Sequence, residues 1–224
     1  MTKDFVQHSC PLPELADCQQ CQRLAGFLQS VRTQHPDYHA RPVGSFGDDC
    51  AKLLIVGLAP GMHGANRTGR PFTGDYAGIL LYQTLHKYGF ATQPESIDAD
   101  DDLQLIGCRI TNAVKCLPPE NKPTPQEIKQ CNGYLMAELT LFAERGGTAL
   151  LALGTIAHQA VLMALQLRMK DFFFAHGAVH DVPGYAGLRL YDSYHCSRYN
   201  TQTKRLTATM FEQVFDRINA DIER

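Results

Sequence analysis

Apolar residues in this chain gather into short continuous runs that alternate with longer segments of helical periodicity. The apolar runs lie at 51–58, 104–115, 148–153 and 187–193. A run of this length is typical of a strand buried on both faces of a parallel sheet. The helical segments lie at 75–90, 124–145, 155–167 and 203–222. Strands that alternate with helices predict an α/β fold, a three-layer α/β/α sandwich around a central, mainly parallel four-stranded sheet.

Capping residues mark where two of these helices begin. Asp75 stands immediately before an apolar-periodic segment, where an N-cap is expected. Thr124 is followed by a proline at the first helical position and by Glu127 three residues on, which predicts a capping box. A further helical arm is expected at about 11–35. The 224 residues are expected to form a single domain over 1–224.

Polar residues follow several predicted strands at the point where each strand ends. They are the loop 59–75, Asn112 and His195. In open parallel sheets, ligands bind beyond the carboxyl ends of the strands. The sequence therefore predicts a ligand site there, although strand ends also carry polar loops for purely structural reasons.

The net charge and the N-terminal residues narrow the possible location and partners of the protein. The net charge is −2, so any nucleic-acid contact must come from local basic loops and not from the whole surface. The first residues contain no apolar signal region, and no apolar run reaches the roughly 18 residues that span a bilayer. A cytoplasmic protein without membrane contact is expected. Its eight cysteines are then metal ligands or buried thiols, and not disulfides.

The segment from Gly64 to Pro71 nearly matches a phosphate-binding P-loop. That motif requires Lys and then Ser or Thr after its second glycine, but Arg70 and Pro71 stand at those positions. The magnesium-binding hydroxyl is missing, and proline removes a backbone donor. A nucleotide-handling enzyme is therefore disfavoured, and no nucleotide cofactor is expected.

Four cysteines form a constellation with metal-binding character. Cys18 and Cys21 make a CxxC pair, and Cys116 and Cys131 bracket a proline-rich loop. Four thiolates around one centre suit either zinc or an iron–sulfur cluster, and the spacing alone does not decide between them. The other cysteines are expected to be ordinary thiols: Cys10, Cys50, Cys108 and Cys196.

Three motifs resemble those of the uracil-DNA glycosylase superfamily, and most closely its family-five branch in bacteria and archaea. The first runs from Gly57 through Gly61 and Phe72 to Asp75. The second is Thr111–Cys116, and the third is His195–Ser197 with the following 200–203. The resemblance extends from Cys18 to the last helix.

The resemblance implies a DNA-repair enzyme. Such an enzyme would flip uracil, and other deaminated bases such as hypoxanthine and xanthine, out of DNA. It would then hydrolyse the N-glycosidic bond in base-excision repair. It also implies a monomer that binds a [4Fe–4S] cluster through Cys18, Cys21, Cys116 and Cys131. The alternative is a non-catalytic iron–sulfur DNA-binding module.

The same resemblance assigns roles in the pocket. Catalysis would fall to Asp75, Asn112 and His195, with His195 bonding the departing base and Asn112 reading its edge. Substrate binding would also use Gly57, Ala59, Pro60, Gly61 and Phe72, the last by stacking. Related families place a water-activating polar residue where this chain has Leu58 and Ala59. Asp75 is then the remaining acid, unless it is only a helix cap.

Phosphate contacts are expected from polar and basic residues in loops at the pocket mouth. The candidates are Arg67, Arg70, Lys122, Arg198, Asn200, Lys204 and Arg205. Each basic residue could equally be a solvated surface charge. The segment 200–203 is expected to enter the groove that the flipped base leaves.

Overall fold

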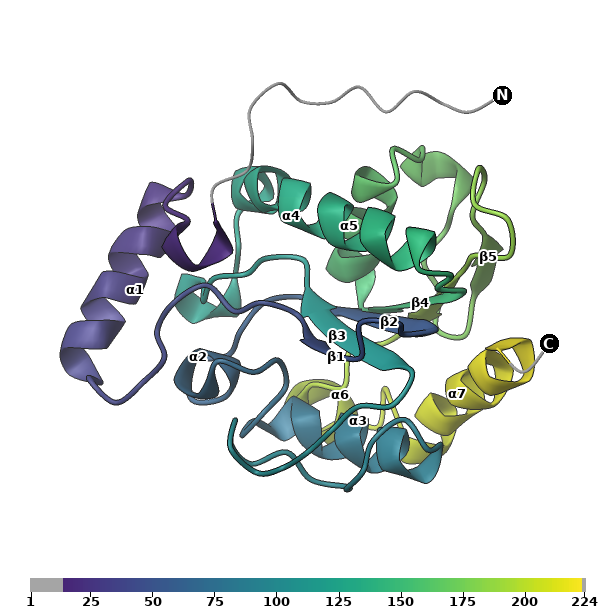
Figure 1. The fold of residues 1–224 in the computed structure, drawn as a ribbon, viewed down its shortest axis with the longest axis horizontal. Coiled ribbons are helices and arrows are strands. Elements are labelled where there is room, and N and C mark those ends of the chain that lie inside the picture. Colours follow the sequence, from purple (N-terminus) through teal and green to yellow (C-terminus); the bar gives the residue numbers. More distant parts are fainter. Residues whose placement is uncertain (1–13, 223–224) are drawn as a thin grey trace.

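The computed structural model describes residues 14–222 of the chain and shows one six-stranded sheet between layers of helices (Figure 1). The strands are β1 (Phe46–Gly47), β2 (Leu53–Gly57), β3 (Cys108–Asn112), β4 (Ala149–Leu153), β5 (Val179–Asp181) and β6 (Arg189–Ser193). Their order in the sheet is β1-β3-β2-β4-β6-β5.

The four predicted strands form the parallel centre of this sheet, which confirms the α/β fold with a mostly parallel sheet. The predicted number of strands was wrong, because β1 and β5 add one antiparallel strand at each edge. These edge strands are two and three residues long. Segments this short carry no apolar run, so their pairing depends on the neighbouring strand.

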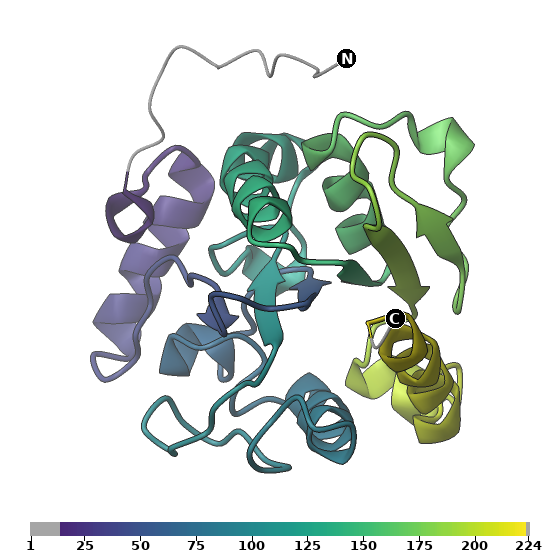
Figure 2. The ribbon, with the colours of Figure 1, turned by 45° about the vertical axis from the view of Figure 1, so that its right-hand side comes forward.

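Helices cover both faces of the sheet, as Figures 1 and 2 show. The longer helices are α1 (Gln22–Gln34), α3 (Tyr76–Lys87), α4 (Pro125–Glu144), α5 (Thr155–Ala164) and α7 (Ala208–Ile222). Shorter turns are α2 (Ala65–Thr68), α6 (Arg198–Gln202), η1 (Leu15–Asp17), η2 (Pro119–Asn121) and η3 (Met169–Asp171). Helices α4 and α5 lie on one face, and α3 and α7 lie on the other.

The alternation of side chains along the central strands divides the core between these two faces. Leu53 and Ile55 of β2 belong to the apolar cluster that includes α3 and α7. Leu54 and Val56 belong to the cluster that includes α4 and α5. Burial on both faces explains why β2 is a continuous apolar run. A third cluster joins α1 to α4 and to the loop after β3.

Both predicted caps are present, and two predicted helices differ in extent. Asp75 caps α3, and Thr124 forms a capping box with Glu127 at the start of α4. The arm predicted at about 11–35 begins outside the described residues, and its first described part is the short η1, followed by α1 from residue 22. The helix predicted at 203–222 begins only at Ala208, as α7, because Lys204 adopts a left-handed φ of 57° in the turn before it.

The topology places a ligand-binding crevice between the strands. The chain leaves β2 toward β3 on one side and returns to β4 on the other side of β2. Such a switch point opens a crevice beyond the carboxyl ends of the strands. Among the described residues, no helix has the length and apolar character that crossing a membrane requires.

Candidate active site and cysteine cluster

A pocket of about 390 Å³ lies at the carboxyl ends of the parallel strands. It is lined by Leu58, Ala59, Gly61, Ala65, Phe72, Asp75, Ala77, Asn112, Asn121, His195, Ser197 and Arg198. These residues come from the loop after β2, the end of β3, the loop before α4 and the segment after β6. Three distant motifs therefore converge on one cavity, as the strand-end pattern predicts.

Asn112 ends β3, and its side chain packs against the neighbouring strand. Its parallel partner in the ladder is Gly57, the last residue of β2. A Cβ atom at Gly57 would collide with Asn112 Oδ1 and with the ring of Phe72. Glycine is therefore required for this close approach. Asn112 Oδ1 is buried and has no hydrogen-bond partner among the described residues.

Phe72 is held in an unusual backbone conformation beside the pocket. Its φ is 57°, in the left-handed region, which costs a non-glycine residue on the order of 1–3 kcal/mol. A Cβ atom at Gly78 would collide with the Phe72 carbonyl oxygen, so the first turn of α3 must carry glycine there. The ring lies nearly parallel to the His195 imidazole, with centroids 5.9 Å apart. Strain at such a position favours a functional role for the aromatic face.

His195 lies two residues beyond the end of β6. Its Nδ1 atom is buried and has no partner among the described residues. Burial lowers the pKa of His195 to about 4, so the imidazole is neutral near pH 7. Asn200 donates from Nδ2 to the His195 carbonyl oxygen at 2.8 Å, which fixes the backbone at this point. A neutral imidazole in the pocket wall can donate one hydrogen bond and accept another.

Asp75 presents its two carboxylate oxygens to different surroundings. Oδ1 accepts a 2.8 Å hydrogen bond from the Gly78 backbone and caps α3. Oδ2 lies on the side of Gly61 and Gly64, where a Cβ atom at Gly64 would stand 2.7 Å from it. Burial raises the pKa of Asp75, although backbone hydrogen bonds from Gly78 and Ala77 act to lower it. One oxygen is thus structural, while the residue also lines the pocket.

Most of the predicted pocket residues line this cavity. Ala59, Gly61, Phe72, Asp75, Asn112 and His195 all do so. Gly57 supports the wall from below, and Pro60 is buried without lining it. Sequence reasoning missed Asn121, a polar lining residue with a left-handed φ of 57°. Its signal is the Asn in a proline-rich loop that follows the second motif, because Asn tolerates that conformation.

Two of the predicted phosphate contacts, Arg67 and Arg70, have their guanidinium groups engaged by acceptors within the protein. Arg70 is 5% exposed, and its guanidinium bonds Thr73, Ser96 and Asp101 inside the protein. Arg67 directs all three of its nitrogens to Asp98 and to the backbone of residues 63 and 97. These bonds use three of the five N–H donors of Arg67 and four of the five of Arg70, which leaves few donors for a phosphate. Both arginines hold the loop around 96–101 against the first motif.

The other predicted phosphate contacts lie in two segments that reach the pocket mouth. Arg198 lines the pocket and places its guanidinium 5.7 Å from the Tyr76 ring centroid. Lys122 follows the pocket residue Asn121, and its side chain is 79% exposed. Lys204 and Arg205 are exposed and continue the segment that begins at Arg198. Asn200 lies in the same segment, between Arg198 and Lys204.

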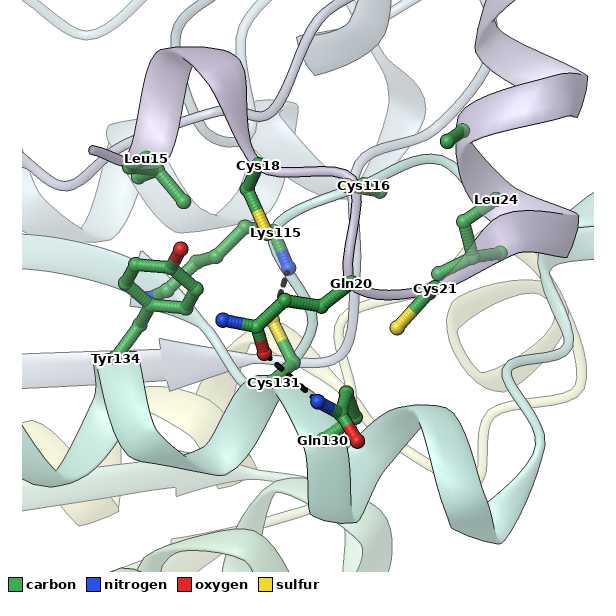
Figure 3. Close-up of a pocket in the computed structure, with 11 residues that line it drawn as sticks. Leu15, Cys18, Gln20, Cys21, Leu24, Lys115, Cys116, Gln130, Cys131 and Tyr134 are labelled. Carbon is green, nitrogen blue, oxygen red and sulfur yellow. Dashed lines mark hydrogen bonds between the residues drawn. The ribbon is translucent and has the colours of Figure 1, made fainter. Parts of the chain in front are cut away.

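The four predicted cysteine ligands come together beside α1 (Figure 3). Cys18 and Cys21 lie between η1 and α1, Cys116 follows β3, and Cys131 is on α4. They line one small cavity whose walls are largely apolar, with Leu15, Leu24 and Tyr134 among them. Lys115 donates its backbone N–H to Cys131 Sγ at 3.3 Å.

The chemistry of this donor set fits a cationic metal centre. Burial, together with the charge that the neighbouring thiolates would carry, raises the pKa of Cys116 to about 12. Four thiolates can therefore share this cavity only around a cation. A set of four thiolates suits either a zinc ion or an iron–sulfur cluster.

An ion pair docks the N-terminal arm onto α4 next to these cysteines. Arg23 of α1 makes a two-pronged contact with Glu127 of α4, at 2.7 and 2.6 Å. Gln130 donates to Gln20 at 2.9 Å across the same boundary. Cys108 and Cys196 are buried and Cys50 is exposed, outside this group as predicted, and Cys10 lies outside the described residues.

The chain was compared with known proteins. The model of the uracil DNA glycosylase superfamily matches residues 45–222. A type-5 uracil-DNA glycosylase of Thermus thermophilus is 47% identical over 89% of this chain and 91% of its own length. One of Pyrobaculum aerophilum is 40% identical over 97% of this chain and 92% of its own. One of Mycobacterium leprae is 43% identical over 90% of each.

These matches cover nearly all of the described residues, and they include the three strand ends that build the pocket. The arm with Cys18 and Cys21 precedes the part that the family model matches. The chain belongs to the uracil DNA glycosylase superfamily and, within it, to the type-5 uracil-DNA glycosylases.

Proposed function

We propose that this protein removes uracil from DNA by hydrolysing the bond between the base and the sugar in base-excision repair. The observation that carries the proposal is the wall of the pocket. Asn112 Oδ1 and His195 Nδ1 are buried there without partners, beside the Phe72 ring. Buried polar atoms without partners are rare and point to a ligand that supplies them. A flat base with polar edges has the chemistry to do so.

The proposed mechanism begins with a flipped base stacked on Phe72. Asn112 offers both a donor and an acceptor, which matches the polar edge of uracil. As the glycosidic bond breaks, its electron pair moves onto the base, which becomes an anion, and the sugar becomes cationic. The neutral His195 donates a hydrogen bond to the base oxygen, and this bond strengthens as the negative charge develops. Water then adds to the sugar carbon and releases a proton, which neutralises the departed uracil anion.

Asp75 is proposed to stabilise the cationic sugar and to orient the attacking water through the oxygen that does not cap α3. Leu58 and Ala59 line the same wall and carry no side chain that could accept a proton. Asn121 faces the pocket from the opposite loop and offers a further polar contact for the water or the base. Hypoxanthine and xanthine are proposed as additional substrates, because the pocket has few polar groups that would reject a larger base.

The cysteine cavity is proposed to hold the [4Fe–4S] cluster, with Cys18, Cys21, Cys116 and Cys131 as ligands. A bound cluster would join the N-terminal arm, the loop after β3 and α4 through iron–sulfur bonds. Lys115 and Cys116 lie only a few residues beyond Asn112, so this anchor also holds the second motif in place. Through these four cysteines, the chain would give structural support to the pocket wall.

We expect anaerobically purified protein to be brown and to contain about four irons per chain. Cys131→Ser should lose iron and lower the melting temperature, because the arm then keeps only its side-chain contacts with α4. Cys50→Ser is the matched control, since Cys50 is exposed and lies outside the cluster cavity. Iron analysis and thermal unfolding measure both effects. Protein that contains zinc and no iron would contradict the assignment.

We expect Arg198→Ala to weaken DNA binding regardless of sequence and to reduce the salt slope by about one unit. Its guanidinium lines the pocket mouth, so it is placed to contact a phosphate next to the flipped nucleotide. Lys52→Ala is the control, because Lys52 precedes β2 at the opposite end of the strands and bonds the Gly146 carbonyl. Binding isotherms at several salt concentrations measure the slope. An unchanged salt slope in the Arg198 variant would show that Arg198 does not contact a DNA phosphate.

A cleavage assay tests the proposed function as a whole. Oligonucleotides that carry uracil, hypoxanthine or xanthine at one position are incubated with the protein, and abasic sites are cleaved with alkali. Cleavage at uracil supports the glycosylase, and cleavage at the other two defines its base range. DNA binding without cleavage of any substrate would favour the alternative, a non-catalytic DNA-binding module.

A further inference from the structure

A second group of titratable side chains lies inside the protein and does not line the pocket. It consists of His158 on α5, His180 on β5 and Asp192 on β6. His158 Nδ1 lies 2.8 Å from Asp192 Oδ1, and His180 Nε2 lies 3.2 Å from Asp192 Oδ2. The Asp192 side chain is fully buried, and those of His158 and His180 are 3% and 16% exposed. Both oxygens of one buried carboxylate are therefore held by imidazoles.

Counting protons shows that this group needs one proton more than an ionised Asp192 and a neutral His158 supply. His158 Nε2 lies 3.1 Å from the Phe172 carbonyl oxygen, which only accepts hydrogen bonds, so Nε2 carries a hydrogen. His158 Nδ1 faces a carboxylate oxygen, which also only accepts when ionised. A neutral imidazole would place a lone pair against that oxygen. A second proton on His158 removes the conflict, and a metal ion shared by the three residues would also do so.

We propose that a doubly protonated His158, together with His180, clamps Asp192 and thereby positions His195 for catalysis. This inference rests on the proposed glycosylase function. The contacts of 2.8 and 3.2 Å are hydrogen-bond distances, and each oxygen of Asp192 then accepts one N–H. The four polar atoms that face one another in this group are all satisfied in that state. His158, His180 and Asp192 are positioning residues in this scheme, since none of them lines the pocket.

The clamp reaches His195 through the first turn of α5. The His158 backbone N–H bonds the Gly154 carbonyl oxygen at 3.1 Å, and the Gly154 N–H bonds the Ser193 carbonyl oxygen at 2.8 Å. A Cβ atom at Gly154 would stand 3.5 Å from His195 Cβ. The same helical turn thus holds Asp192 by a side chain and Ser193 by its backbone, and it begins close to His195. A shift of β6 against α5 would move the imidazole of His195.

The charge state of the clamp should appear in the pH dependence of stability. Burial lowers the pKa of His158, but the hydrogen bond and the charge of Asp192 raise it more, so the net shift is upward. The groups that face His158 are Asp192 from β6, His180 from β5 and the edge of the Phe174 ring. From α4, the uncharged Asn132 bonds the Ala160 carbonyl of α5. A raised pKa means that this stabilisation is complete below the ordinary histidine pKa and is lost as pH rises through the folded value.

Asp192→Asn tests the clamp with little change in shape, and Asp181→Asn on the neighbouring strand is its control, since that side chain is 90% exposed. We expect Asp192→Asn to melt about 10 °C lower at pH 6 and to lose the decline in stability toward high pH. Single-turnover cleavage at saturating enzyme should slow by about tenfold to 100-fold, with DNA affinity unchanged. The imidazole nitrogen spectrum of the unaltered protein should show both His158 nitrogens protonated at pH 7.

Two results would overturn the proposal. One is a His158 ring with a single protonated nitrogen at pH 7, accompanied by one zinc ion per chain that Asp192→Asn releases in native mass spectrometry. The other is an Asp192→Asn variant that folds and cleaves at the wild-type rate, which would leave the group without a positioning role. If the unaltered protein cleaves no uracil-containing DNA, the proposed function fails, while the nitrogen spectrum and the melting profile still decide whether the clamp exists.

Discussion

Replacing His195 with alanine is expected to slow single-turnover cleavage of uracil-containing DNA by about 100- to 1,000-fold. The hydrogen bond from this imidazole strengthens only as the departing base becomes an anion, so its loss raises the barrier. Affinity for intact DNA should change little, because the uncharged base in the ground state gains less from the same donor. Single-turnover rates and equilibrium binding, measured on the same duplex, separate the two effects.

The protonation state of His195 sharpens this prediction. Its pKa of about 4 means that the imidazole does not titrate between pH 5 and pH 8. The His195 contribution to the rate should therefore be constant over that range. His86→Ala is the matched control, since His86 is exposed in the last turn of α3. A His195→Ala rate within a few-fold of wild type would make His195 a structural residue.

Asp75→Asn is expected to slow cleavage by about 100- to 10,000-fold without loss of stability. Asparagine caps a helix about as well as aspartate, so the bond to Gly78 should survive. Asparagine carries no charge, however, and can neither stabilise the cationic sugar nor orient water as a base. Asp75→Ala should lose both functions, with a cap penalty of about 0.5–2 kcal/mol. Thermal unfolding and single-turnover cleavage of the two variants distinguish a cap from a catalytic group.

The raised pKa of Asp75 leads to two further predictions, one for the pH dependence of stability and one for that of the cleavage rate. The pKa of Asp75 is higher in the folded protein than in the unfolded chain, so the ionised carboxylate disfavours folding. The free energy of unfolding therefore falls as pH rises through these two pKa values. Near pH 7 the Asn variant should therefore be at least as stable as the wild type. The cleavage rate should fall as pH drops through the raised pKa, because the carboxylate becomes protonated. Asp75→Asn should lack this fall in rate at low pH, which is the acidic limb of the pH–rate profile.

The control for this pair is Asp100→Asn, which removes a carboxylate that is exposed. It should leave the rate, the melting temperature and the acidic limb unchanged. A fully active Asp75→Asn variant would mean that the backbone of the first motif, or no base at all, activates the water. Asp75 would then be only the cap of α3, which is the role that the helix geometry by itself establishes.

The parallel centre of the fold and the ends of its strands can be predicted from the amino-acid sequence. Buried strands such as β2 and β4 need apolar side chains on both faces, so each is visible as a continuous run. Caps such as Asp75 and Thr124 are equally local, because each bonds a backbone amide three residues away. The motif residues could be placed at one edge of the sheet, since the carboxyl ends of parallel strands lie together.

Which polar groups are available to a ligand depends on contacts between distant parts of the chain. Arg70 and Arg198 look alike in the sequence, but one is enclosed by acceptors and the other lines the pocket. The edge strands β1 and β5 were not visible either, because short polar segments take their conformation from the elements beside them. The group around Asp192 joins three separate elements. Local patterns record only a residue's neighbours along the chain, whereas these assignments depend on contacts between residues far apart in it.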